Sequence, residues 1–486
     1  MSAPRRKPGG SANAGTPSET PDPRTKGDSP MTRRWLPALA TMILMSCAAS
    51  GRAETLERRL PNGLQVLLVP DPAASAVDVA VWYATGPADE PAGRSGLTHL
   101  MERMMFHGSK QYGDGEYARR MRELGASFNT FLAPDFSEFH STGPSASLEG
   151  MLRLEADRMA GQRLTAATLA TEIRALRNEQ RRLGEVPLSR GLQELYSTAF
   201  GSHPYGRPLQ GRSEDAARLT LPALTEFARA RYVPGNALVT VVGNFEPASA
   251  ESMVARSFGA VPARPTPTRG AARVPAGGER RGRVRLPARL LMAAWNAPPD
   301  SACGVEMAVI AHVLGGGSRP RLTSELVRKQ RLAINASCVF DGRRSASLLY
   351  TTALVPPASD SGVVEFQILD QVERLAREPL TEAELEGARK ALLLAARVEQ
   401  SGVRGRAQAL GLAHMTSGHW SRADRRLERI ASISAEDVRK VAEQVLREGS
   451  RTVIWGTPTA APARPAPRPA AKPAATPAAS TKGGRP

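Results

Sequence analysis

The order of strand-like and helix-like segments repeats once along this chain, on either side of a segment with the composition of a linker. Residues 261–283 are rich in Pro, Gly, Ala and Arg. Before this segment, alternating apolar stretches enclose a series of helical patterns, and a similar order follows it. Strands on both sides of helical runs predict an α+β fold of two halves, each a largely antiparallel sheet with helices packed on one face.

Composition predicts the limits of these halves. We predict domains at 54–260, the first half, and 284–457, the second half, joined by the basic linker 261–283. Each is long enough to bury a core of its own. The N-terminal segment 1–53 is expected to be disordered apart from an export signal, and the Pro/Ala-rich tail 458–486 is expected to be disordered throughout.

The periodicity of apolar residues predicts individual elements within the halves. Helices are expected at 95–107, 115–125, 147–160, 165–183, 220–231, 303–314, 360–377, 381–400, 404–416 and 435–447. Strands are expected at 64–69, 77–86, 237–245, 284–297, 332–340, 347–355 and 451–456.

The formal net charge of +18 does not indicate a nucleic-acid-binding protein. Residues 1–53, 261–289 and 458–486 contribute +5, +7 and +5 of it, so the rest of the chain is close to neutral. A footprint for nucleic acid would be a basic stripe on a folded face, whereas this charge lies mainly in Pro-, Gly- and Ala-rich segments. We therefore expect no nucleic-acid partner.

Residues 31–55 have the pattern of an export signal: two arginines, an apolar stretch and then small residues. The apolar stretch is shorter than the roughly 20 residues of a membrane-spanning helix. "LMSC" resembles a bacterial lipobox, which would make Cys47 a lipidated residue, and cleavage near Ala53 is the other interpretation. Both predict an exported protein, periplasmic or associated with the envelope. Cys303 and Cys338 are expected to be core thiols, although the sequence does not say whether they pair.

The run "HLMERMMFHG" beginning at His99 carries the chemistry of the first half. On a helix, His99 and position 103 lie one turn apart on the same face, with Glu102 beside them. Histidines at both positions could bind one zinc ion, while the glutamate activates the bound water. Position 103 is arginine, which has only donors and keeps its proton, so it cannot ligate a metal. His107 lies about 12 Å further along a straight helix and is too far from His99 to replace it.

Seven segments in their order resemble the insulinase/pitrilysin family of metallopeptidases, which includes the mitochondrial processing peptidase. The resemblance covers nearly all of residues 55–457 and rests on "LPNGLQVLLVPDP", "GLTHLMERMMFHGS", "GASFNTFLAPDFSEF", "RNEQRR", "HPYGRPLQG", "YVPGNALVTVVGN" and "LGGGSRPRLTSELVRKQRLA". The stretch from Leu314 lacks the Gly-Lys-Ser/Thr ending of a phosphate loop, and the resemblance implies a Gly-rich turn after a helix.

The resemblance implies roles for the residues of this motif. His99 is the first zinc ligand and Glu179 the third, Glu102 is the general base, and Glu172 supports the ligands, so that Glu102 and Glu172 are the catalytic candidates. Arg103 stands in place of the second histidine ligand. We expect Arg103 to pair with Glu179, and also with Glu102, so that a guanidinium lies where zinc would be. The alternative is an Arg103 without a partner.

The resemblance also implies a peptide site. On the edge strand that receives substrate, Asn129 and Asp135 are kept, and the family's usual tyrosine and threonines are replaced by Phe139, Ser137 and Leu132. In the second half, Arg343 and Tyr350 are the nearest candidates for a pair that holds substrate. Their alternative roles are a surface arginine and a core tyrosine.

These features predict an exported, insulinase-like protein with a defective zinc site. It would bind a peptide or unfolded segment as an added strand, and form a homo- or heterodimer with an intact paralogue. Two alternatives stay open: an active zinc endopeptidase that uses His99, Glu179 and an unforeseen ligand, and an envelope-anchored binding protein without enzymatic activity. Zinc is the cofactor expected of an active protein, and none is expected of a defective one.

Overall fold

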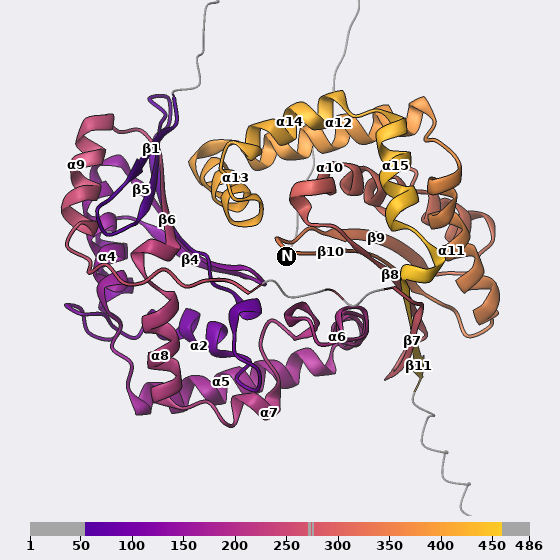
Figure 1. Ribbon diagram of the computed structural model, residues 1–486, viewed down its shortest axis with the longest axis horizontal. Helices are drawn as coiled ribbons and strands as arrows, with labels where there is room; N and C mark the ends of the chain where they lie inside the picture. Colours follow the sequence, from indigo (N-terminus) through magenta and orange to yellow (C-terminus); the bar gives the residue numbers. More distant parts are fainter. Residues whose placement is uncertain (1–53, 271–273, 275–276, 459–486) are drawn as a thin grey trace, which may run out of the picture. The chain divides into compact units, whose positions relative to one another are not determined.

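The computed structural model describes residues 54–270, 274 and 277–458, which contain two β-sheets and the helices that cover them (Figure 1). Six strands form the first sheet in the order β1-β2-β6-β3-β5-β4, and five form the second in the order β7-β11-β8-β10-β9. The pairs β2–β6 and β7–β11 are parallel and the other pairs are antiparallel. The predicted α+β fold with two largely antiparallel sheets is confirmed.

The strands of the first sheet come from the first half of the chain and those of the second from the remainder. In the first sheet they are β1 Leu56–Arg59, β2 Gln65–Pro70, β3 Ala76–Tyr83, β4 Ser127–Ala133, β5 Phe136–Pro144 and β6 Ala237–Gly243. In the second they are β7 Arg280–Leu286, β8 Leu290–Ala297, β9 Asn335–Asp341, β10 Ser347–Leu354 and β11 Arg451–Pro458.

The helices follow the predicted ranges to within a few residues, and α6, α7, α9 and α14 are additional. In the first half they are α2 Leu97–Met104, α3 Glu116–Glu123, α4 Leu148–Ala160, α5 Ala166–Glu185, α6 Pro187–Phe200, α7 Ser213–Ala216, α8 Leu221–Arg231 and α9 Pro247–Phe258. In the second they are α10 Asp300–Ala311, α11 Ser361–Arg377, α12 Glu382–Glu399, α13 Gly402–Ser417, α14 Arg422–Ser432 and α15 Ala435–Val445. None of these helices is long and apolar enough to span a membrane.

Two segments differ from the expected elements for identifiable reasons. The strand expected at 284–297 is two strands, because Pro287 lies between β7 and β8 and has no N–H to donate to a ladder. β7 begins at Arg280, within the segment expected to be linker, and pairs with β11.

The stretch from Leu314 belongs to a π-helical turn that directly follows α10, as expected for a Gly-rich turn. A Cβ on Gly315 would lie 2.0 Å from the backbone nitrogen of Cys338, so this turn requires glycine.

The cysteines of the second half are both free and buried, as expected. Burial raises the pKa of the Cys303 thiol to about 12. The expected export signal and Cys47 lie outside the described residues.

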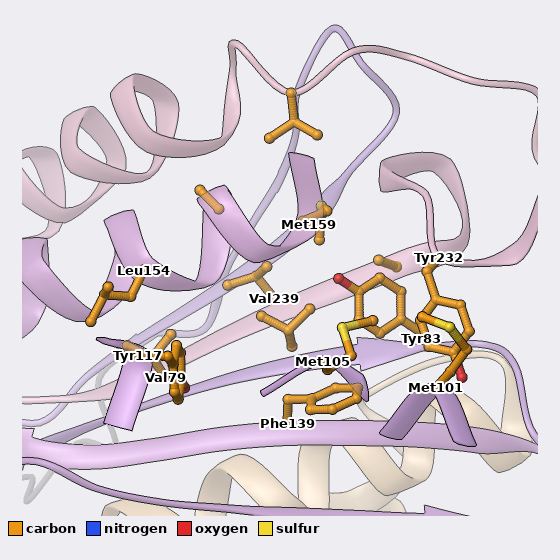
Figure 2. Packing of buried hydrophobic residues seen from close by; sticks show 14 of the residues in the cluster. Val79, Tyr83, Met101, Met105, Tyr117, Phe139, Leu154, Met159, Tyr232 and Val239 are labelled. Carbon is orange, nitrogen blue, oxygen red and sulfur yellow. The ribbon is translucent and has the colours of Figure 1, made fainter. Parts of the chain in front are cut away.

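Helices α2 to α5 and α7 to α9 contribute the helical side of the first core (Figure 1). Figure 2 shows part of it, where side chains of the strands meet those of α2 and its C-cap and of α4: Val79, Tyr83, Phe139 and Val239 from the sheet, and Met101, Met105, Leu154 and Met159 from the helical segments. Burial of such side chains contributes about 1.5–3 kcal/mol each. This core fixes α2, the helix that carries His99.

The second face of each sheet is covered by a helix from the other half of the chain. Helix α13 packs against β3 and β6, where its Leu410 joins a cluster with Trp82 and Leu238. Helix α6 packs against β7, β8 and β11, where its Leu195 joins a cluster with Met292. Both faces of the central strands are therefore buried, which explains why β3 reads as a nearly continuous apolar run.

A buried charge cluster lies where α13 meets the first sheet. Asp78 of β3 and Glu138 of β5 are fully buried. Arg404 of α13 donates to Glu138 and lies 3.8 Å from Oδ1 of Asp78, and Thr142 donates to Oδ2 of Asp78 at 2.7 Å. One guanidinium thus serves two carboxylates. Burial raises the pKa of Asp78 to about 7 and also raises that of Glu138, and it lowers the pKa of nearby His140 to about 4.

Asp78 should give the protein an unusual pH dependence. Its pKa is about 7 in the folded state against an ordinary value of 3.8, so the folded state binds more protons than the unfolded state between these values. The contribution of Asp78 to the free energy of unfolding should therefore rise as the pH falls from 7 to 4, by on the order of 2–4 kcal/mol. The Asp78→Asn variant should lose this contribution in urea unfolding measured across that range. Identical pH profiles for the two proteins would contradict it.

Gly411 should be required for the contact between α13 and the first sheet. A Cβ at this position would lie 2.1 Å from Cε2 of the buried Trp82. Gly→Ala inside a helix ordinarily stabilises by about 1 kcal/mol. Gly411→Ala should instead destabilise by about 1–3 kcal/mol, because α13 must move. Gly387→Ala in α12, where a Cβ meets nothing within 4 Å, is the control and should stabilise. Urea unfolding measures both, and changes of the same sign would refute the prediction.

Candidate functional site on helix α2

Helix α2 is held at its N-terminus by a buried carboxylate. Gly96 is the N-cap residue and has φ +102°, a conformation that favours glycine. The backbone N–H groups of Gly96 and Thr98 donate to Glu90 at 2.9 and 2.7 Å. Burial raises the pKa of Glu90 to about 7, against the lowering effect of these hydrogen bonds. The start of α2, and with it the motif, is therefore fixed in place.

The structure brings His99 and Glu179 together. Helix α2 packs against α5, which carries Glu172 and Glu179 two turns apart. Nε2 of His99 lies 3.2 Å from Oε2 of Glu179, and the His99 side chain is 11% exposed. Nδ1 of His99 is buried and has no hydrogen-bond partner among the described residues. The residues that the resemblance implies as first and third ligands are thus adjacent.

Arg103 lies across the same pair of glutamates. Its Nε donates a short hydrogen bond to Oε2 of Glu172, and its Nη1 lies 3.9 Å from Oε2 of Glu179. The expected contact with Glu179 is therefore the longer of two, and Glu172 is the closer partner. The expectation that Glu102 also pairs with Arg103 is wrong, because Glu102 accepts a hydrogen bond from Oγ1 of Thr130 on β4.

Glu172 has a second partner, His107. Nε2 of His107 lies 2.8 Å from Oε1 of Glu172, and its Nδ1 lies 3.2 Å from Asp114. Burial lowers the pKa of His107, but its bonds to Glu172 and Asp114 outweigh this and raise the pKa overall. Burial acts to raise the pKa of Glu172, and His107 and Arg103 outweigh it, so that this pKa is lowered. His107 reaches Glu172 because α2 ends at Met104.

These residues do not fit the coordination of a catalytic zinc ion. Such sites normally use three protein ligands. Here His99 and Glu179 are two, the oxygens of Glu172 are engaged by Arg103 and His107, and Arg103 offers only donors. Within residues 54–270, 274 and 277–458, no group of three or more His, Cys, Asp or Glu residues is arranged to hold a metal ion.

The residues implied for the peptide site lie on two different strands. Asn129 is on β4, which is one of the two edge strands of the first sheet. Ser137 and Phe139 are buried on β5, between β3 and β4, so their expected place on the edge strand is wrong. The cause is the reversal of the chain between β4 and β5. Asp135, in that reversal, is buried and accepts a hydrogen bond from the Tyr205 hydroxyl at 2.6 Å.

Arg343 is not the surface arginine considered as an alternative. It is buried, its Nη2 lies 2.6 Å from Oδ2 of Asp341, and its guanidinium lies 4.7 Å from the ring centre of Tyr196. Tyr350 is half-buried, with its ring 6.1 Å from that of Tyr196 in an edge-to-face arrangement. Both residues thus contact the same tyrosine. Their role toward a substrate stays a prediction.

Two contacts of this site, those of His107 and Thr130, were not predicted from the sequence. The sequence suggests a role for His107 only as a zinc ligand, and the length of a straight helix excludes that role. Thr130 alternates with Asn129 on β4, and its position facing α2 follows from the two-residue period of a strand once β4 is identified.

Comparisons with known proteins identify the family of this chain. Two family models match the chain, "Insulinase (Peptidase family M16)" at residues 65–213 and "Peptidase M16 inactive domain" at residues 218–392. An uncharacterized zinc protease of Mycobacterium tuberculosis is 25% identical over 401 residues, covering 80% of this chain and 90% of that protein. The zinc protease PqqE of Helicobacter pylori is 25% identical over 366 residues, covering 72% and 82%.

Solved structures share the fold. A protease from Helicobacter pylori has a TM-score of 0.76 at 22% identity, covering 84% of this chain and 100% of that chain. A chain of complex III2 from Candida albicans has a TM-score of 0.67 at 16% identity, covering 83% and 96%.

The contact between Glu172 and His107 should control the protonation of this histidine. Glu172→Gln keeps the size of the side chain and removes its charge, so the pKa of His107 should fall because burial then acts with less opposition. Asp114→Asn removes the more exposed partner and is the matched comparison, with a smaller expected effect. An NMR titration of 13C-labelled histidine measures the pKa, with the signal assigned by His107→Gln. An unchanged pKa in Glu172→Gln would show that the pair does not form.

Proposed function

Because this chain belongs to the insulinase (M16) family of peptidases, we propose that it is an exported member with a defective zinc site, which binds a peptide and pairs with an active paralogue. The catalytic chemistry would then reside in the paralogue. This chain would contribute a surface that holds an unfolded segment.

The observation that carries the proposal is the position of Arg103. Its guanidinium lies against Glu172 and Glu179 of α5, at the place in the motif where a metal ligand would be required. Two carboxylates in a partly buried site repel one another unless a cation lies between them. Arg103 supplies such a charge through a group of the protein itself, and His107 adds a hydrogen bond to Glu172.

The edge strand β4 supports peptide binding. Its outer side carries backbone groups that no strand among the described residues pairs with, and an extended peptide can add to such an edge. Phe131 of this strand is 47% exposed and offers apolar contact to a peptide side chain. Glu102, bonded to Thr130, lies directly behind the edge strand.

The proposed pairing of this chain with an active paralogue is supported by the fold alone. A chain of complex III2, a multi-subunit assembly by its name, has this fold, so the fold is compatible with a place in a larger assembly. Export rests on the sequence pattern of residues 31–55.

The rival function is an active zinc endopeptidase. The contact between His99 and Glu179 favours it, because these two residues already lie side by side. It needs a further ligand in place of Arg103. The two functions predict different zinc contents for the wild-type protein.

Replacing Arg103 by histidine should restore metal binding. We expect wild-type protein equilibrated with zinc and then gel-filtered to hold far less than one zinc per chain, and Arg103→His to hold about one, because the third ligand is present. Elemental analysis of the purified proteins measures this. The double variant Arg103→His/His99→Ala is the control and should lose the metal again.

The same preparations can be tested for cleavage of labelled peptides. Wild-type protein alone should cleave no faster than a chelator-treated sample. Stoichiometric zinc in wild-type protein, with chelator-sensitive cleavage, would refute the proposal and establish the rival function.

A further inference from the structure

A second candidate binding site lies in the second half, outside the region of α2. A cavity of about 600 Å³ is lined by residues of α10, α12, α13 and α14 and by Phe340 and Gly342 near the end of β9. Its volume is within the range of about 300–1,000 Å³ that ligand sites in proteins occupy. The site described above contributes no residue to it.

One wall of this cavity is a row of four arginines on α14. Arg422, Arg425, Arg426 and Arg429 follow one another at intervals of three, one and three residues, which places them on one face of the helix. Like charges at this spacing repel and destabilise a helix. A row of this kind therefore needs negative charge beside it.

Only two of the four arginines have a carboxylate partner among the described residues. Nη2 of Arg429 lies 2.6 Å from Glu306, and Nη1 of Arg426 lies 3.6 Å from Asp300. Arg422 donates to the backbone oxygen of Ser301 and Arg425 has no ion-pair partner among the described residues. Two guanidinium groups at the cavity thus remain without a carboxylate.

The row is held on a rigid support. Arg406 of α13 donates two hydrogen bonds of 2.8 Å to the carboxylate of Asp424, which fixes α14 against α13. On the same α14, Ile430 packs into the core of the second half. The arginines are therefore presented by a fixed helix rather than by a loop.

The rest of the lining decides which kind of anion fits. Leu412 of α13 is 42% exposed and lines the cavity together with Val305 and Phe340, so that part of the wall is apolar. Glu399 also lines it and would repel a ligand whose charges are as dense as those of a polyphosphate or a nucleic acid. A ligand with separated carboxylates and apolar groups between them suits both kinds of wall.

We propose that this cavity binds an acidic peptide segment in which acidic and apolar side chains alternate. The row from Arg422 to Arg429 extends about 10 Å along the helix axis. Two side chains on one face of an extended peptide lie about 7 Å apart, so two carboxylates can reach two arginines while the intervening side chain meets Leu412. The proposal rests on the proposed function, since it names the class of peptide that this chain takes.

The test uses the mature chain alone and a fluorescein-labelled decapeptide of alternating Glu and Leu, with fluorescence anisotropy as the readout at low salt. Wild-type protein should bind this peptide, and a version with Gln in place of Glu should bind at least about tenfold more weakly. Arg422→Gln/Arg425→Gln should weaken binding of the acidic peptide by a similar factor. These arginines have no carboxylate partner, so the fold should be kept, which thermal unfolding checks.

Two further variants make the test specific. Arg218→Gln/Arg397→Gln removes the same charge from two exposed arginines that do not line the cavity, and should leave the affinity within about twofold. Leu412→Asp places a carboxylate on the apolar wall and should weaken binding by about tenfold or more.

The outcomes separate this inference from the proposed function. Equal binding by wild-type protein and Arg422→Gln/Arg425→Gln, or equal loss in the control variant, would overturn the acidic-peptide site. Binding of a Lys/Leu decapeptide in place of the acidic one would overturn it as well, while the proposed peptide-binding subunit would stand. The zinc content of the Arg103 variants tests the defective site independently of any peptide.

Discussion

The exchange of helices between the two sheets is the constraint on which the rest of this structure depends. Helix α13 of the second half covers β3 and β6, and α6 of the first half covers β7, β8 and β11. Each sheet is thereby buried on both faces, and the cluster on the second face of each sheet contains residues of both halves. The burial of Asp78 and Glu138 at one of these contacts is tolerated because Arg404 arrives on α13 to pair with them.

The geometry of the α2 site depends on the elements that hold α2 in place. The first sheet and its core fix α2, the Glu90 carboxylate fixes the start of that helix, and α5 packs beside it. Because α2 and α5 are both rigid, their side chains can meet in few ways, and Arg103 of α2 lies against Glu172 and Glu179 of α5.

Much of the fold could be predicted from the sequence because its elements are long and periodic. The helices at 166–185 and 361–377 and the strands at 65–70 and 347–354 lie close to their expected ranges. β4 and β5 are not among the strands expected from periodicity, and the resemblance implied a single edge strand in this region. Helix α6 is not among the helices expected from the sequence. The sheet that it covers lies in the other half of the chain, and no local sequence pattern indicates this contact.

The sequence predicts which residues belong to the candidate site, but not which of them contact one another. The seven-residue spacing of Glu172 and Glu179 places both on one face of a helix, and nothing in the sequence decides which is closer to Arg103. The position of His107 depends on where α2 ends, which is the least predictable property of a helix. The burial of Arg343 depends on Tyr196 of α6, and so on a helix whose partner sheet the sequence does not reveal.

The exchanged helices also bear on how this chain responds to a protease. A single cut in the segment that joins the two sheets would leave α6 still packed on the second sheet and α13 still packed on the first. The two fragments would stay together as a non-covalent complex, and separating them would expose an apolar face on each. The two halves of the sequence are thus related in the way that two subunits of an obligate dimer are related, although one chain encodes both.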